Sequence, residues 1–168
     1  DHVIHLAGLK SVSESMSFPT RYFNNNILGS INLLEMMQRH NIKKIIFSSS
    51  ATVYGHPNKL PLSENHVLNP VNIYGKTKLI VENMIKDLIL AGDLSSGICL
   101  RYFNPIGSYK NGLLGEDPRT ASDNLIPQIL QKISNDSKIL NVYGENLDTL
   151  DGSAVRDFIH ISDLIDGH

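Results

Sequence analysis

Tyr74 and Lys78 stand four residues apart, and Ser50 lies upstream at the end of the run Phe47-Ser48-Ser49-Ser50. Side chains at this spacing share one face of a helix, so the Lys78 ammonium can favour the ionised form of the Tyr74 phenol. A free phenol has a pKa near ~10 and is a poor base at neutral pH. Lowering that pKa by about three units takes roughly 4 kcal/mol, which is about what one unit charge supplies at ~4 Å in an effective dielectric of 20. One ammonium and one bound cation would therefore make Tyr74 a general base. A tyrosine and a lysine at this spacing are also common on exposed helix faces, so the interpretation depends on the surrounding residues.

The elements around these residues predict an α/β fold with a doubly wound parallel sheet. Short apolar runs predict strands over 3–7, 44–47 and 98–103, and helical spacing of apolar residues predicts a helix over 20–39 that starts near Phe18-Pro19 and ends at Asn41. Tyr74 and Lys78 fall on a second helix, whose apolar stripe is Leu79, Val81, Met84, Ile85 and Leu88. Residues 55–72 form the loop before it. Both of the first two strands end in small or polar residues, and ligands of parallel α/β sheets bind beyond such strand ends.

The regular alternation of strands and helices stops after Pro105. Turn signals follow, and the pattern then predicts a helix over 125–133, strands over 140–143 and 156–160, and a final helix capped by Ser162. This part is expected to be a smaller lid, so the domain division is placed at 1–105 and 106–168.

Composition excludes several classes of function. The 168 residues are 41% apolar and carry a formal charge of -2 with no long basic run, which argues against a surface for nucleic acid or an anionic membrane. No stretch approaches the ~20 apolar residues of a membrane span. Cys99 is the only cysteine and sits between apolar residues, so a buried thiol and a reducing cytoplasm are expected. The seven histidines lack metal-ligand spacing, and no metal site is predicted.

Seven segments in register resemble the UDP-glucose 4-epimerases, a family within the short-chain dehydrogenase/reductases. They are Ala7-Gly8-Leu9-Lys10, Asn25-Asn26, residues 48–55, Tyr74-xxx-Lys78, residues 101–105, Asn124-Leu125-xx-Pro127 and residues 155–160. The resemblance spans essentially the whole chain and implies that it is the central part of a longer enzyme. Residues 1–105 would be the second half of an NAD-binding Rossmann domain. Residues 106–168 would belong to the nucleotide-sugar-binding region, with 154–168 returning toward the Rossmann domain.

The resemblance also implies roles for individual residues. Ser50 would hydrogen-bond the sugar 4-hydroxyl and relay its proton to Tyr74, with Thr52 close by, and Lys78 would also hold a nicotinamide ribose hydroxyl. The implied NAD contacts are Leu6, Ala7, Gly8, Leu9, Lys10, Asn25, Ser50, Tyr74, Lys78, Tyr102 and Phe103. The implied UDP-sugar contacts are Lys10, Ser50, Ala51, Thr52, Tyr74, Tyr102, Phe103, Asn104, Asp123, Asn124, Leu125, Asn141, Val142, Tyr143 and Arg156. Simpler interpretations exist for several of these: Tyr143 as ordinary core, and Arg156 paired with Asp157 on the surface.

Ala51 and Thr52 separate the possible chemistries. Sugar-nucleotide dehydratases and decarboxylases of similar sequence carry an extra acid or base at these places, and neither residue here can act as one. The expected reaction is therefore oxidation followed by reduction at one carbon. The resemblance implies that this carbon is C4 of UDP-glucose and UDP-galactose and that the complete enzyme is a homodimer. Asp123 departs from the family pattern and would repel a diphosphate.

Two alternatives stay open at this point. One is a UDP-N-acetylhexosamine 4-epimerase. The other is a non-catalytic remnant or binding module, because the family's glycine-rich G-x-x-G-x-x-G turn is not among these residues. Without preceding strands, the strand at Val3 would leave an unpaired apolar edge, so the isolated chain is expected to be poorly soluble.

Overall fold

The computed structural model describes residues 1–108, 114, 124–135, 139–141, 144 and 146–168. The chain forms two compact units. Asp1–Tyr102 and His168 make up the first, and Phe103–Gly167 make up the second. Each unit is described by itself.

A three-stranded parallel sheet forms the centre of the first unit. Its strands are β1 (Val3–His5), β2 (Lys44–Ser48) and β3 (Ser96–Leu100), in the order β1-β2-β3. Ile4 pairs with Ile46, which pairs with Ile98. Parallel neighbours require crossover connections, and helices supply them here. This arrangement confirms the predicted α/β class with a parallel sheet, although the first and third strands end earlier than predicted.

The helix predicted over 20–39 is built in three consecutive parts. They are α2 (Pro19–Tyr22), a π-helical segment (Phe23–Leu28) and α3 (Gly29–Arg39). Asn41 follows with a φ of 55°, a left-handed conformation that asparagine tolerates, and so ends the helix as predicted. A further helix, α1 (Val12–Ser17), was not predicted; the Ser11 hydroxyl caps it by accepting from the Glu14 amide.

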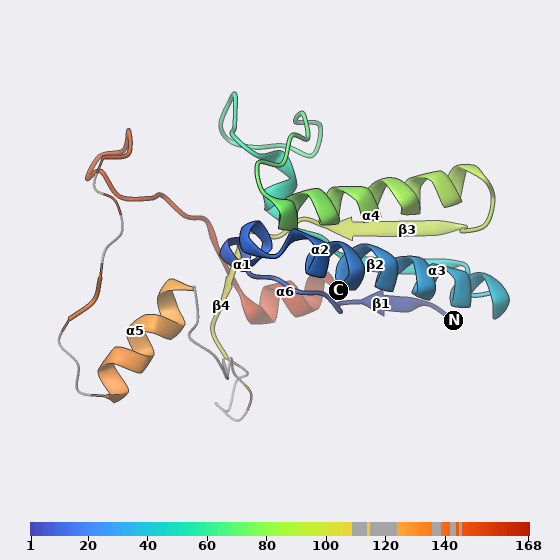
Figure 1. Ribbon diagram of the computed structural model, residues 1–168, viewed down its shortest axis with the longest axis horizontal. Helices are drawn as coiled ribbons and strands as arrows, with labels where there is room; N and C mark the ends of the chain where they lie inside the picture. The colour runs from blue at the N-terminus through green and yellow to red at the C-terminus, as the bar shows by residue number, and fades with distance from the viewer. Residues whose placement is uncertain (109–113, 115–123, 136–138, 142–143, 145) are drawn as a thin grey trace. The chain divides into compact units, whose positions relative to one another are not determined.

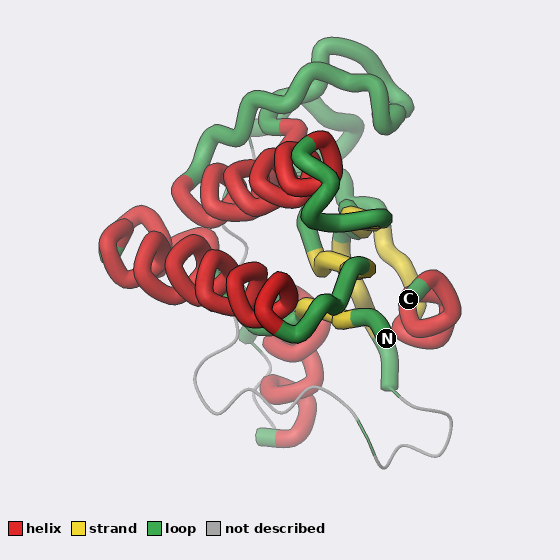
Figure 2. The backbone as a smooth tube through the Cα atoms, turned by 90° about the vertical axis from the view of Figure 1, so that its right-hand side faces the viewer, coloured by secondary structure: helices red, strands yellow, loops and turns green. Residues whose placement is uncertain are grey.

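The core of the first unit lies between the sheet and two long helices, α3 and α4 (Ile73–Leu90), which run side by side on one face of the strands (Figures 1 and 2). Its buried members are Leu34, Met37, Ile45, Phe47, Val81, Ile85 and Leu94. Burying each large apolar side chain contributes about 1.5–3 kcal/mol. The packing of α4 against the sheet holds the first turn of this helix close to the carboxyl end of β2. A short 3₁₀ turn, Ala51–Tyr54, leads the chain away from that strand end.

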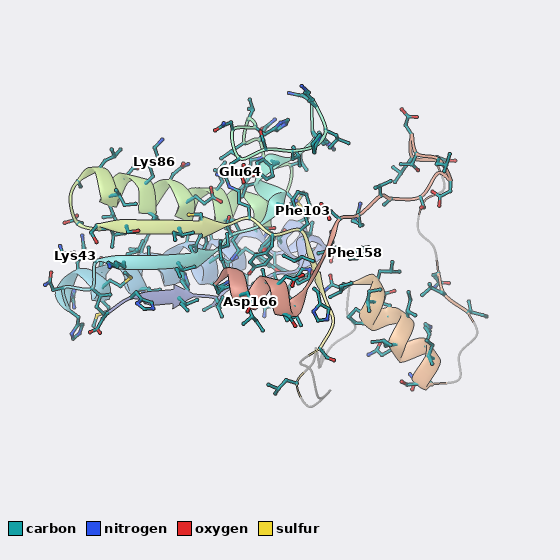
Figure 3. The ribbon with its side chains drawn as sticks, turned by 180° about the vertical axis from the view of Figure 1, so that it is seen from behind. Lys43, Glu64, Lys86, Phe103, Phe158 and Asp166 are labelled. Atoms are coloured by element: carbon teal, nitrogen blue, oxygen red, sulfur yellow. The ribbon has the colours of Figure 1, made fainter. Side chains whose placement is uncertain are left out.

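The second unit contains a two-stranded parallel sheet, β4 (Asn104–Ile106) and β5 (Phe158–His160), with α5 (Leu125–Ser134) and α6 (Ile161–Gly167). Figure 3 labels Phe103, which immediately precedes β4, and Phe158, which begins β5. β4 was not predicted, because the third strand was expected to end at Phe103 and the regular alternation to stop after Pro105. The predicted strand over 140–143 is not formed at Leu140 and Asn141, and Val142 and Tyr143 lie outside the described residues.

The predicted cap of the last helix is wrong. Ser162 lies inside α6, and its backbone amide donates to the Nδ1 atom of His160 at 3.2 Å. The imidazole therefore supplies the acceptor that the serine hydroxyl was expected to supply. Cys99 lies half-buried in β3, and burial raises the pKa of its thiol to about 11.

Within the described part of the chain, no helix is long and apolar enough to cross a membrane. The same residues contain no group of three or more histidine, cysteine or acidic side chains that could hold a metal ion.

Two glycine substitutions test the packing of the first unit, because they are expected to change the free energy of unfolding in opposite directions. A Cβ added at Gly97 in β3 would lie 2.5 Å from Cγ2 of buried Ile85, so Gly97→Ala should destabilise the complete protein by about 1–3 kcal/mol. A Cβ at Gly29 meets nothing within 4 Å, and Gly29→Ala should stabilise the helix by about 0.5–1 kcal/mol. Urea unfolding of both variants is the measurement, and a Gly97→Ala protein as stable as wild type would contradict the packing described.

Candidate active site

Three successive turns of α4 present Tyr74, Lys78 and Glu82 on one face of the helix, at intervals of four residues. Asn72 starts this helix, and its Oδ1 accepts from the Gly75 amide at 2.7 Å. Each of the three side chains interacts with the serine run at the end of β2: Tyr74 with Ser50, Lys78 with Ser48 and Glu82 with Ser49. Side chains one helical turn apart on α4 therefore reach three consecutive serines at the end of β2.

Lys78 is buried, with only 5% of the residue exposed. Its Nζ donates to the backbone carbonyl of Ser48 at 2.7 Å and lies 4.8 Å from the centre of the Phe47 ring and 5.7 Å from that of Tyr74. Burial lowers the pKa of this ammonium to about 8. A lysine with such a pKa still carries its charge at neutral pH and acts in a low-dielectric environment, where its field is strong.

The pKa of Tyr74 differs in direction from the sequence-based expectation. Burial raises it above the ordinary value, a hydrogen bond from Ser50 opposes that effect, and the nearby Tyr102 hydroxyl adds to the rise. The expected lowering by Lys78 does not dominate, because removing the phenol from water disfavours its charged form and the ammonium is engaged with Ser48. In this chain Tyr74 is therefore a neutral phenol at physiological pH.

Ser50 and Thr52 complete a line of hydroxyl groups that ends at Tyr74. Thr52 donates to Oγ of Ser50 from both its amide, at 3.2 Å, and its own Oγ1, at 3.0 Å. Because the Ser50 oxygen accepts both of these bonds, its own proton is left to donate, and Tyr74 is its hydrogen-bonding neighbour. The structure thus brings together all four residues predicted to be catalytic, and the arrangement can pass a proton between Ser50 and Tyr74.

The turn after β1 is held by an asparagine that the sequence analysis did not single out. Asn26 Oδ1 accepts from the Leu9 amide at 2.8 Å, while Nδ2 donates to the Leu9 carbonyl at 3.0 Å and to Thr77 Oγ1 at 3.2 Å. Asn26 is buried, whereas the predicted contact Asn25 is exposed. The signal that could have found it is a run of three asparagines, which are poor helix formers, within a predicted helix.

Gly8 lies against this asparagine and Lys78. A Cβ at Gly8 would lie 3.3 Å from Asn26 Oδ1 and 3.7 Å from Lys78 Nζ. The other predicted residues of this turn, Leu6, Ala7 and Lys10, are exposed, and Leu9 is half-buried. Backbone without a side chain at Gly8 therefore leaves the approach to Lys78 open.

Tyr102 also lies at the serine run. Its hydroxyl hydrogen-bonds to that of Ser48, and its backbone carbonyl accepts from the Ala51 amide at 3.0 Å. Both contacts fall within the first unit. Tyr102 thus lines the same strand end as Lys78.

The remaining predicted residues belong to the second unit. Asn104 Nδ2 donates to the Asp157 carbonyl at 2.9 Å, and Arg156 Nη1 donates to the Val155 carbonyl at 3.0 Å. Asn124 occupies the cap position of α5, Leu125 begins that helix, and Phe103, Leu125, Asn141 and Arg156 are exposed. Asp123, Val142 and Tyr143 lie outside the described residues.

The profile of the NAD dependent epimerase/dehydratase family matches residues 1–168. The chain belongs to this family. The UDP-glucose 4-epimerase of Pisum sativum is 52% identical over all 168 residues, and that of Bos taurus is 48% identical over 167. In each case the chain covers 48% of the relative, so it spans about half the length of the curated relatives it matches.

Solved structures agree with this assignment to the epimerase/dehydratase family. The UDP-glucose 4-epimerase from Bifidobacterium longum, in complex with NAD+ and UDP, superimposes with a TM-score of 0.95 at 47% identity, over 100% of this chain and 50% of that one. A UDP-N-acetylglucosamine 4-epimerase from Methanobrevibacter ruminantium M1 gives 0.82 at 33% identity, over 99% of this chain and 49% of that one. The resemblance inferred from the motifs is confirmed.

The burial of Lys78 predicts a stability cost that depends on pH. Its pKa falls from 10.5 to about 8 on folding, so below pH 8 the folded state bears a cost on the order of 3 kcal/mol, which disappears as pH rises to 10.5. Lys78→Met removes this cost but loses a hydrogen bond of about 1 kcal/mol. The complete Lys78→Met protein should be more stable than wild type by about 2 kcal/mol at pH 7, and this advantage should shrink between pH 8 and 10.5.

Chemical denaturation of both proteins across this pH range measures the difference. Lys76→Met, at an exposed lysine on the same helix, is the matched control and should stay within about 0.5 kcal/mol of wild type. An advantage of Lys78→Met that is constant with pH would contradict the assigned cost.

Proposed function

We propose that the complete protein interconverts UDP-glucose and UDP-galactose through transient oxidation at C4, with NAD as its cofactor. The observation that carries this proposal is the line Thr52–Ser50–Tyr74 beside the buried Lys78 ammonium. The relatives support the substrate class, since UDP-glucose 4-epimerases are 48–52% identical to this chain. The UDP-N-acetylglucosamine 4-epimerase is less similar, at 33%.

The residues of the first unit fit a nicotinamide cofactor. The turn at Gly8 leaves room for a close approach, and Lys78 and Tyr74 offer an ammonium and a hydroxyl of the kind that binds ribose hydroxyl groups. We assign NAD binding to Leu6 through Lys10, Asn25, Ser50, Tyr74, Lys78, Tyr102 and Phe103. When bound, NAD supplies a positively charged hydride acceptor.

In the proposed mechanism Tyr74 first releases its own proton to solvent, a loss that the positive charges of Lys78 and of bound NAD would favour. Ser50 then accepts the proton of the sugar 4-hydroxyl as it passes its own proton to the Tyr74 phenolate. Thr52 keeps the Ser50 hydroxyl oriented toward the phenol by donating to its oxygen. The Lys78 ammonium, whose Nζ lies 5.7 Å from the centre of the Tyr74 ring, stabilises the phenolate form in this mechanism. The same residues return the proton when the 4-keto sugar is reduced on its other face.

The residue types at positions 51 and 52 favour epimerisation over elimination. Ala51 and Thr52, which flank the relay, cannot abstract a proton from carbon. A hydroxyl relay serves only the C4 oxygen, and that is sufficient for oxidation followed by reduction at one carbon. For the second unit we propose nucleotide contacts by Asn104, Asn124, Leu125, Asn141 and Arg156, since arginine matches phosphate geometry.

We further propose that the complete protein acts in the cytoplasm as a homodimer. Cys99, the single cysteine of these 168 residues, suits a reducing compartment. Exposed apolar side chains on α3 and α4, including Met36 and Ile80, support an interface between two copies.

Tyr74→Phe should lower turnover by at least ~100-fold, because a general base contributes that much or more. The affinity for the UDP-sugar should stay nearly unchanged, since the change removes a role in the transition state. Tyr22→Phe, at a buried tyrosine whose hydroxyl donates to Glu14 instead, is the control and should keep wild-type turnover. Steady-state kinetics of the complete enzyme decide the matter, and a Tyr74→Phe protein with more than about a tenth of wild-type turnover would overturn the assignment.

An isotope experiment tests the reaction itself. In deuterated water the complete enzyme should interconvert the two sugars with no deuterium at C4 or C5 and no net NADH, because the hydride leaves and returns within the site. NMR of the product sugars is the measurement. Deuterium at C5 would instead show proton abstraction there and would place the protein among dehydratases or 5-epimerases.

A further inference from the structure

The buried carboxylate of Glu82 accepts a hydrogen bond from Ser49, the residue that precedes the proposed catalytic serine, Ser50. Glu82 is on the third turn of α4, and only 6% of its side chain is exposed. Oε1 accepts from the Ser49 hydroxyl, and the two carboxylate oxygens accept from Arg101 Nε and Nη2, at 2.7 Å for Nη2–Oε2. Ser49 is itself only 1% exposed. A charged group in this position is unusual, because its burial is costly unless every lone pair finds a partner.

Arg101 connects the carboxylate to the segment that follows Ser50. Its Nη1 donates to the Tyr54 hydroxyl and to the Glu64 carbonyl, each at 3.3 Å, and its guanidinium lies 5.2 Å from the centre of the Tyr54 ring. Hydrogen bonding to Glu82 raises the pKa of the guanidinium, so Arg101 stays charged. One arginine thereby joins α4, the 3₁₀ turn and the loop beyond it.

Ser50 is flanked on both sides by fixed neighbours. The Ser49 side chain before it is held by Glu82, and the Ala51 amide after it donates to the Tyr102 carbonyl at 3.0 Å. Glu82, which holds Ser49, is bound by Arg101, and Tyr102, which holds Ala51, is the next residue in the chain. The two restraints on the neighbours of Ser50 therefore end at adjacent residues. The backbone of the catalytic serine is thus fixed relative to α4, which carries Tyr74.

Stability alone gives little reason for this ion pair. Replacing a buried ion pair by apolar side chains of similar volume is often neutral or stabilising. What an apolar replacement cannot reproduce is the directional hydrogen bond to Ser49. A shift of about 1 Å in a reacting group can cost ~100-fold in rate.

We propose that Ser49, Glu82 and Arg101 are positioning residues that set the Ser50 hydroxyl against Tyr74. None of the three touches the reacting atoms; they act through the backbone of Ser50. This inference rests on the proposed epimerase function, and it assigns to Ser49 an effect on turnover rather than on substrate binding.

The test uses the complete enzyme with Ser49→Ala, which removes the hydrogen bond without changing any charge. We expect kcat for UDP-glucose to fall about 10- to 100-fold while KM stays within about threefold. Ser49→Thr keeps the hydroxyl and should recover kcat to within about threefold of wild type. Ser95→Ala is the control, because it removes a serine hydroxyl whose hydrogen bond goes to the backbone carbonyl of Lys43, at the opposite end of the sheet.

Turnover is expressed per folded molecule, with the folded fraction measured by circular dichroism at the assay temperature, so loss of folding cannot imitate the effect. The pH dependence of kcat should keep its position, since no charge is altered. Wild-type kcat in Ser49→Ala, a loss that appears in KM instead, a kcat that Ser49→Thr does not restore, or a pH profile displaced by more than about half a unit would each overturn the positioning role. Turnover by the wild-type enzyme tests the proposed function separately, because the positioning role concerns only the ratio of variant to wild type.

Discussion

The hydrogen bond from the Lys78 ammonium to the Ser48 carbonyl, at 2.7 Å, joins α4 to the end of β2 in a buried environment. An ammonium removed from water must find such a partner, and Ser48, at the last paired position of β2, supplies its carbonyl. This bond sets the distance between the helix and the serine run, so the contacts of Tyr74 and Glu82 one turn away on either side depend on it. The lowered pKa of Lys78 reflects the free energy of folding that is lost by burying a charged ammonium at this position.

Polar contacts around α4 are concentrated on its first three turns, while its later turns pack by apolar contact. Thr77 accepts from Asn26 and donates to the Tyr74 carbonyl, which links the turn after β1 to the same helix. Val81 and Ile85, further along, contribute to the core instead. The helix therefore serves two purposes: its carboxyl-terminal half anchors it, and its amino-terminal half arranges hydroxyl, ammonium and carboxylate groups around three serines.

The family assignment and the geometry of the first unit support each other from independent observations. The identity of about half the residues to UDP-glucose 4-epimerases concerns the chain as a whole, whereas the Thr52–Ser50–Tyr74 line is a local arrangement of atoms. The chain spans about half the length of those relatives. The reaction is accordingly a property proposed for the complete protein, and we propose that the chain described here contributes its proton-transfer residues.

By itself, the sequence was sufficient to predict the parallel α/β architecture, the helix that carries Tyr74 and Lys78, and the meeting of Ser50 and Thr52 with them, because these follow from local periodicity and from motifs with fixed spacing. It could not predict that Asn26, rather than Asn25 beside it, would be buried, since the π-helical segment changes which residue faces inward. It also could not predict the Ser49–Glu82–Arg101 contacts, which join residues 33 and 19 positions apart. Only the tertiary structure decided these contacts and the raised pKa of Tyr74, because they depend on how α4 packs against the sheet and how much water that packing excludes.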